Sequence, residues 1–269
     1  MNKKYIYKYF FRNTLHSFLF WLVIFIIVFE FALPFLLKIP TMIELSQSGR
    51  SKLIERMILE QLNLNLYIFG FFLAPALGII AGRALVNQEI EVLLTHRLSR
   101  KDLFTSGFIF YGLFLFSIWL IFIILYLIVT YIFDHKIPLE LVFKLVISLF
   151  GIFLPFLWVS FFSLNAKPVA VILLYLVVYL SMPSLAGYFE HPGNTGIEKF
   201  LANTSKVISI IVPQTQSFQL IVSPFSPVDK TGTHYTIFKW FLYGILWSLF
   251  LLLSGFLIYQ RKDLIPHQT

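Results

Sequence analysis

Six apolar runs, each at least 19 residues long, occupy more than half of this chain. An α-helix needs about 20 apolar residues to cross the hydrocarbon core of a bilayer. The 269 residues are 58% hydrophobic and only 13% charged, whereas about a quarter of a typical soluble domain is charged. We therefore predict an all-α integral membrane protein with a single transmembrane domain. The six predicted spans are residues 17–37, 64–82, 103–133, 139–164, 169–189 and 236–260.

The first run follows a basic segment, as the apolar part of a signal peptide does. Residues 17–37 are longer than such a part usually is, and no A-x-A-like cleavage site follows them. We therefore expect a retained span, with residues 1–16 lying at the membrane interface before it.

Lys and Arg give the orientation, because they concentrate in cytoplasmic loops. Eleven of them lie among the 49 residues that one side of the membrane would receive, namely 1–16, 83–102, 165–168 and 261–269. Eight lie among the 77 residues of the other side, namely 38–63, 134–138 and 190–235. This difference predicts that both termini are cytoplasmic. The outer segment 190–235 either gates an exit or is an ordinary connection, and the sequence does not choose between them.

The inner loop 83–102 contains a predicted short amphipathic helix. Asn87 is a suitable N-cap, and Glu89 and Glu91 fall in the first turn, where the helix dipole favours acidic residues. Leu93 and Leu94 continue an apolar face that begins at Ile90. Such a helix can rest on lipid headgroups or dock into a groove of a partner protein, and the physical argument alone leaves the two nearly even.

The end of this loop has a recognisable helix start. Ser99 and Asp102 have the spacing of a capping box, which predicts that the third span begins there.

Residues 89–103 resemble the segment that follows the second span in ABC type-2 permeases. Glu91 and the pair Leu93-Leu94 match the core of that segment, and Leu98-Ser99-Arg100 matches the turn after it. Two features differ, since no Gly-Thr precedes the core and Arg97 stands where proline is frequent. The span count, the basic aromatic N-terminal segment and the long outer segment before the last span are also similar to the family.

The resemblance implies a coupling helix that docks on a separate ABC ATPase subunit, where ATP and Mg²⁺ would bind. It also implies a second permease subunit, either an identical or a related chain, with the transport path between the two. The residues expected to dock on the ATPase are Glu89, Glu91, Leu93, Leu94, His96, Arg97 and Arg100.

The chain itself has no signature of ATP hydrolysis. It lacks a G-x-x-x-x-G-K-[ST] phosphate loop, and its inner loops are too short for a nucleotide-binding domain. It has no cysteine, and its six histidines all lie outside the spans or at their edges, so we expect no metal site and no cofactor in this chain. No basic cluster is long enough for nucleic acid, so the net charge of +8 is assigned to lipid headgroups.

The second span carries a small residue every four positions, which predicts close approach of another helix. We expect this face to pack within the subunit, and a dimer or sliding surface is the alternative. The four residues are Gly70, Ala74, Gly78 and Gly82.

Glu30 is the one acidic residue deep inside a predicted span. Such residues are rare in membranes and usually pair with another group or serve function. A structural partnership with Lys144 or Lys239 is the preferred interpretation, and a role in transport stays open.

These observations favour the permease subunit of an ATP-driven exporter in a bacterial cytoplasmic membrane. The alternatives are an intramembrane enzyme, a secondary transporter, and a membrane scaffold or assembly factor. An intramembrane enzyme would need convergent acids or histidines at membrane depth, and a secondary transporter would favour repeated halves, neither of which the sequence has. The substrate and the direction of transport cannot be read from the residues.

Overall fold

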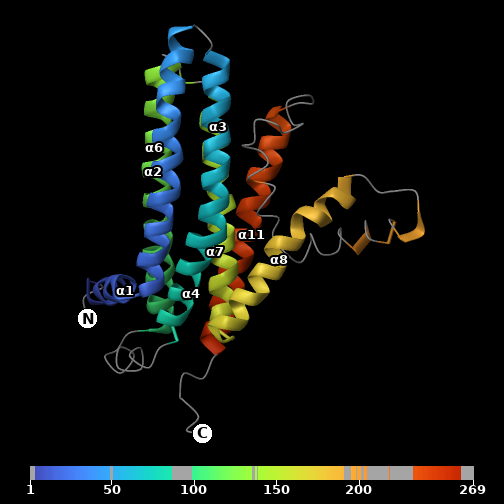
Figure 1. Ribbon diagram of the computed structural model, residues 1–269. Helices are drawn as coiled ribbons and strands as arrows, with labels where there is room; N and C mark the ends of the chain where they lie inside the picture. Colours follow the sequence, from blue (N-terminus) through green and yellow to red (C-terminus); the bar gives the residue numbers. More distant parts are fainter. Residues whose placement is uncertain are drawn as a thin grey trace.

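The computed structural model describes residues 4–48, 51–86, 99–134, 137, 139–190, 195–197, 199–200, 203–204, 218 and 233–261. In this part of the chain the secondary structure is helical and contains no strand, so the predicted all-α class is confirmed. The helices form an elongated bundle (Figure 1). Its elements are α1 (Lys4–Leu15), α2 (Phe18–Gln47), α3 (Ser51–Ile68), η1 (Phe69–Leu73), α4 (Ala74–Ala84), α6 (Arg100–Asp134), α7 (Leu139–Ser163), α8 (Pro168–Glu190) and α11 (Thr233–Arg261).

Four helical stretches are long and apolar enough to cross a membrane, which indicates a membrane protein. They are Leu64–Ala84, Arg100–Ile132, Val142–Ser163 and Phe238–Arg261. The two other predicted spans, 17–37 and 169–189, fall within α2 and α8 respectively.

Two helices run well past the apolar segments that predicted them, and a third is longer than the hydrocarbon layer is thick. Helix α2 continues to Gln47 and α3 begins at Ser51, so most of the expected outer segment 38–63 is a helical hairpin. A hydropathy argument marks only what the hydrocarbon covers, whereas backbone hydrogen bonds carry a helix on into the aqueous layer. Helix α6, with 35 residues, is about 50 Å long at 1.5 Å per residue, against about 30 Å of hydrocarbon.

Helix α7 lies at the centre of the bundle and packs mainly against α4 and α11. The α4 side of this contact is made of glycines. A methyl group added to Gly78 would lie 2.8 Å from the Phe156 carbonyl oxygen, and one added to Gly82 would lie 2.5 Å from the Ser163 Cβ. The two backbones are therefore as close as the absence of side chains allows.

The second span contains one π-helical turn, η1, between α3 and α4. The Ala74 amide donates to the Phe69 carbonyl, five residues back. The next hydrogen bond of this kind would run from the amide of residue 75 to the Gly70 carbonyl. Residue 75 is a proline, which has no N–H to donate. The Tyr175 hydroxyl of α8 donates to the Gly70 carbonyl instead, so a side chain from another helix satisfies the buried oxygen that the proline leaves.

Buried polar groups also join the outer halves of α2, α3 and α6. The Asn65 side-chain amide donates to the Tyr126 hydroxyl, and Lys38 Nζ donates to Gln61 Oε1 at 3.1 Å. Gln61 and Asn65 are both buried. A buried polar group needs a hydrogen-bond partner, and these bonds supply one to each of the two side chains.

The helices alternate in direction, so the ends of several elements gather at one end of the bundle. This end, at the bottom of Figure 1, contains α1, the last turn of α4, the first turn of α6, the turn between α7 and α8, and the last turn of α11. The hairpin between α2 and α3 lies at the opposite end. The described parts of the segments that the charge count assigned to the cytoplasm thus share one end of the molecule.

Candidate functional site: the basic end of the bundle

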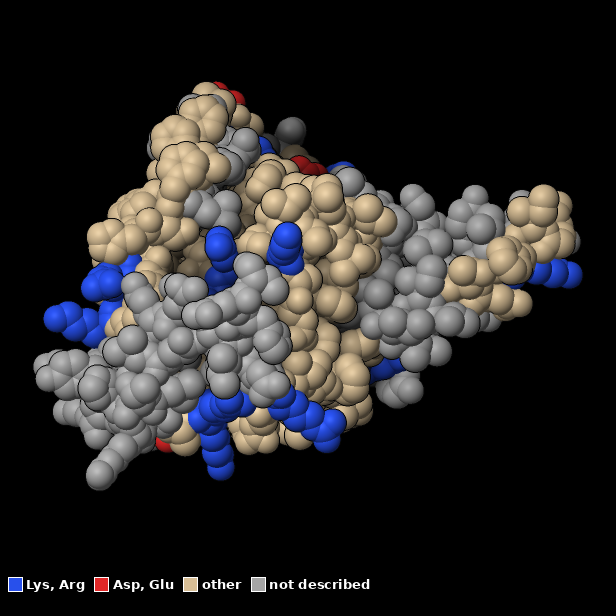
Figure 2. All heavy atoms as spheres, turned by 90° about the horizontal axis from the view of Figure 1, so that it is seen from below, with Lys and Arg blue, Asp and Glu red and all other residues tan. Residues whose placement is uncertain are grey.

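The end of the bundle that holds α1 is strongly basic. Figure 2 views the molecule from this side and shows Lys and Arg side chains both at its edge and near its middle. Asp102 is the single acidic residue among the described side chains at this end. The basic ones, all exposed or half-buried, are Lys8, Arg12, Arg83, Arg100, Lys101, Lys167 and Arg261. We call this region the basic end.

The opposite end has charges of both signs. Helix α3 carries an exposed pair there, in which Arg56 Nε lies 3.3 Å from Glu60 Oε1, and α2 carries Lys38 and Glu44. Lys144 and Lys239 lie near the starts of α7 and α11 and add two basic side chains toward this end, but the net positive charge of the described side chains is larger at the basic end.

Helix α1 lies across the basic end and is amphipathic. Ile6, Phe10 and Thr14 are buried at four-residue spacing, while Lys8 and Arg12 are exposed. Phe10 stacks edge-on against Tyr111 of α6, with ring centroids 5.7 Å apart. The buried face thus fixes α1 to α6 and leaves its charges outward.

Side chains donate hydrogen bonds to the carbonyls in the last turns of α1 and α4. The Tyr9 hydroxyl donates to the Ala84 carbonyl in the last turn of α4, at 3.3 Å. Trp21 Nε1 donates to the Leu15 carbonyl at the end of α1, at 2.7 Å. Carbonyls in the last turn of a helix have no partner inside the helix, so these bonds also tie α1, α2 and α4 together.

The start of α6 is capped as its sequence predicts. The Asp102 amide donates to Ser99 Oγ at 3.0 Å, and Ser99 Oγ donates to Asp102 Oδ2 at 2.6 Å. The predicted capping residues therefore fix where the chain re-enters the bundle after the inner loop.

Arg100 is engaged within the chain. Its Nη1 donates to the Gln260 carbonyl at 2.9 Å, which joins the first turn of α6 to the last turn of α11. A guanidinium is favourable there because the end of a helix carries partial negative charge. The docking role of Arg100 stays a prediction, and the structure gives its side chain a partner within the chain.

The other predicted docking residues lie outside the described residues, as does the amphipathic helix that would carry them. They are Glu89, Glu91, Leu93, Leu94, His96 and Arg97. The described chain stops at Val86 and resumes at Ser99, and both positions belong to the basic end.

The four small residues of the second span all lie inside the chain's own bundle. Gly70, Ala74, Gly78 and Gly82 are buried. The last two meet α7 as described above, and Gly70 offers its carbonyl to Tyr175. Glu30 belongs to α2, but its side chain lies outside the described set, so the proposed pairing with Lys144 or Lys239 stays a prediction.

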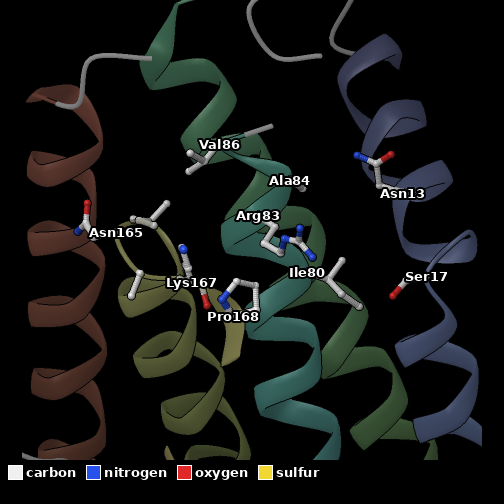
Figure 3. Close-up of a pocket in the computed structure, with 12 residues that line it drawn as sticks. Asn13, Ser17, Ile80, Arg83, Ala84, Val86, Asn165, Lys167 and Pro168 are labelled. Atoms are coloured by element: carbon white, nitrogen blue, oxygen red, sulfur yellow. The ribbon is translucent and has the colours of Figure 1, made fainter. Parts of the chain in front are cut away.

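A cavity of about 540 Å³ opens at the basic end. It lies between the α1–α2 junction, the last turns of α4, and the turn from α7 to α8. Figure 3 shows Arg83 between Asn13 and Ser17 on one side and Lys167 on the other. Asn165 and Ser163 also line it, and the lining contains no carboxylate. Two features of this cavity are visible in the sequence, namely the turn at 165–168 and the basic residue at the end of the second span. Their spacing along the chain does not indicate that they lie close together in the fold.

A second cavity, of about 710 Å³, lies between α6, α7 and α11. Apart from Lys101, Thr105 and Ser248 its lining is apolar, with Phe104, Phe108 and other aromatic rings. It faces outward along two helices whose surfaces are mostly exposed, as a lipid-facing groove would be.

No family model, curated protein or solved structure matches this chain.

Proposed function

We propose that the chain is the membrane-spanning permease subunit of an ATP-driven exporter, and that its basic end docks a separate ABC ATPase subunit. One observation carries the proposal. Helix α1, the end of α4 and the start of α6 all lie at the basic end, and the last two flank residues 87–98. The ATPase would supply the sites for ATP and Mg²⁺, and this chain would supply the membrane path.

Six spans are supported by the alternating direction of the helices. Four stretches have the length and composition of a span. Helix α2 has 30 residues and α8 has 23, which is sufficient for each to cross as well. Crossing by all six would place α1 and the end of α11 on the same side.

The charge distribution supports a cytoplasmic position for the basic end. Loops rich in Lys and Arg stay on the cytoplasmic side during insertion. The described basic side chains there come from five separate elements, so they form a face of the protein and not one short cluster. In a bacterium this face would belong to the inner side of the cytoplasmic membrane.

The packing supports a mechanical role for the segment 87–98. At one edge of the segment, α4 is held tightly on α7 through Gly78 and Gly82. At the other, the first turn of α6 is held to α11 through Arg100. A partner that moved this segment would therefore act on two helix ends that are each fixed to a further helix, and such a movement passes through rigid elements.

Two copies of the chain, or this chain and a related one, would enclose the path. The substrate is left open in this proposal. An intramembrane enzyme and a membrane scaffold without transport are the alternatives, and recovery of a partner ATPase separates them from the exporter.

The proposal is tested by purifying the tagged chain in mild detergent and identifying co-purifying proteins by mass spectrometry. We expect an ABC ATPase in fixed stoichiometry. The variant Glu91→Lys with Arg97→Glu keeps the net charge and is expected to reduce the recovered ATPase at least about tenfold, as loss of paired interface charges does.

The matched control is Arg56→Glu with Glu60→Arg, which reverses an exposed ion pair at the opposite end. It should leave recovery of the ATPase unchanged. Recovery of the folded chain with no ATPase in any preparation would refute the exporter proposal and favour a scaffold or an intramembrane enzyme.

A further inference from the structure

We infer that the cavity at the basic end binds the phosphate of an anionic membrane lipid, whose acyl chains lie along the exposed faces of α2 and α8. This inference requires only that the bundle spans a bilayer, and it does not depend on an ATPase partner.

Two cationic side chains line the cavity without a described acidic partner. Arg83 comes from the last turns of α4 and Lys167 from the turn before α8. Within the described ranges neither makes a hydrogen bond or an ion pair. The cavity thus has two positive charges and no lining carboxylate, which is the composition of a site for an anion.

A buried hydroxyl points to the same kind of ligand. Ser163 lines the cavity with an exposed fraction of only 6%, and its Oγ has no hydrogen-bond partner among the described residues. Buried hydroxyl groups in folded proteins nearly always have a partner. The Oγ atom is covered in the structure, so a phosphate oxygen in the cavity would become an acceptor for this donor after rotation of the Ser163 side chain about its Cα–Cβ bond.

Two helix starts border the cavity and add to its positive potential. Helix α8 begins at Pro168 and α2 begins just after Ser17, and both residues line the cavity. Ser17 makes no capping hydrogen bond with α2, so its hydroxyl is available to a ligand. The first turn of a helix has unpaired amides and favours anions, although here it only supplements the cations and Ser163.

The surroundings of the cavity identify the anion as part of a lipid. Phe18 and Trp21 at the start of α2 are 79% and 54% exposed, and Val169 and Leu173 at the start of α8 are 68% and 58% exposed. Large apolar side chains of two helices therefore stand open beside an anion site at the end of the bundle. A phosphate with two acyl chains matches both features, whereas free phosphate would use only the first. The cavity volume lies within the range of about 300–1,000 Å³ typical of ligand pockets.

The test uses native mass spectrometry of the full-length chain, delipidated in detergent and titrated with defined lipids. We expect dioleoyl phosphatidylglycerol to bind with higher affinity than dioleoylglycerol, which lacks the phosphate. Arg83→Gln with Lys167→Gln should weaken phosphatidylglycerol about thirtyfold, at roughly fivefold for each basic residue. Ser163→Ala should weaken it by a smaller factor, about threefold to tenfold.

The matched control is Lys8→Gln with Arg261→Gln. It removes the same charge from the same end of the bundle, at two exposed residues that do not line the cavity. Its affinity for phosphatidylglycerol should change by no more than about twofold. An equal loss in both double variants would overturn the proposal, because general attraction to a basic surface would then explain the binding.

Two further arms separate the sources of the phosphate. Inorganic phosphate and glycerol 3-phosphate at millimolar concentration should not displace the lipid. Displacement by either would overturn the lipid assignment and leave a site for a soluble phosphate. Equal binding of phosphatidylglycerol and dioleoylglycerol would overturn the anion site altogether. Circular dichroism of each variant verifies that the helices are retained.

Discussion

The α4–α7 contact and the α6 and α11 surfaces are all built from strongly apolar helices, yet they are buried to very different extents, and the most apolar of the four, α6, is among the most exposed. In Leu64–Ala84 and Val142–Ser163, 72% and 67% of the most apolar stretch is buried. In Arg100–Ile132 and Phe238–Arg261 the share is 22%. Overall apolarity cannot account for this difference, because lipid and protein interior are equally good solvents for apolar side chains.

Small residues account for it better. The α4 side of the central contact has glycines where the helices meet, so backbone atoms of α7 come within contact distance. On α11, Gly244 also lies close to α7, but the atoms nearest to an added methyl group there belong to the Phe150 ring and not to the α7 backbone. Gly255 makes only ordinary contacts with Phe104 and Phe161, at 3.5 Å and 3.7 Å from an added methyl group. Helix pairs in membranes associate where shape permits close packing, and the comparison shows where this chain uses that rule.

The largest effect is expected from Gly82→Ala, which attacks the central contact. The added methyl group would lie 2.5 Å from the Ser163 Cβ and 3.0 Å from the Ser160 carbonyl oxygen. Neither atom can move without shifting α7, so we expect a loss of about 3 kcal/mol in stability. The measurement is the free energy of unfolding in mixed micelles titrated with denaturing detergent. An unchanged value would show that α4 and α7 separate at little cost.

A smaller loss is expected from Tyr175→Phe, which removes the donor to the Gly70 carbonyl. A buried carbonyl without a partner costs about 1–2 kcal/mol. The same unfolding titration measures it. Tyr131→Phe removes a hydroxyl from a side chain that is 59% exposed and serves as the control. Equal effects of the two substitutions would mean that the π turn does not depend on α8.

The smallest effect, and one of opposite sign, is expected from Gly255→Ala on α11. The added methyl group meets no atom closer than 3.5 Å, and alanine is the better helix former by at most about 1 kcal/mol. The variant should be as stable as the unsubstituted chain or slightly more stable. A loss as large as that of Gly82→Ala would end the distinction between centre and periphery.

Much of the fold could be predicted because long apolar runs specify helices without reference to tertiary structure. Helices α6, α7, α8 and α11 begin and end within three residues of the predicted spans. The C-terminal end of α2 and the start of α3 differ from the predicted spans by ten residues or more, since polar residues such as Lys38 and Gln61 continue these helices and pair with each other.

The cavity could not be predicted, because it is made by elements that are distant in sequence. Arg83 and Lys167 are single basic residues at span ends, and many membrane proteins carry such residues at the interface. What brings them together is the close packing of α4 on α7, which places the last turn of one helix beside the last turn of the other. The glycines were visible in the sequence, but their partner was not.

The π turn has a consequence for how one span serves two neighbours. A helical residue turns the chain by about 100°, so one residue added to a single turn rotates every later side chain by that amount relative to the earlier ones. Before η1, α3 faces α2 and α6, and after it α4 faces α7. Deletion of one residue from Phe69–Leu73 would turn Gly78 and Gly82 away from α7 and present bulkier side chains in their place. The π turn thus changes the rotational register of the side chains within one span, so that α3 packs on α2 and α6 while α4 packs on α7.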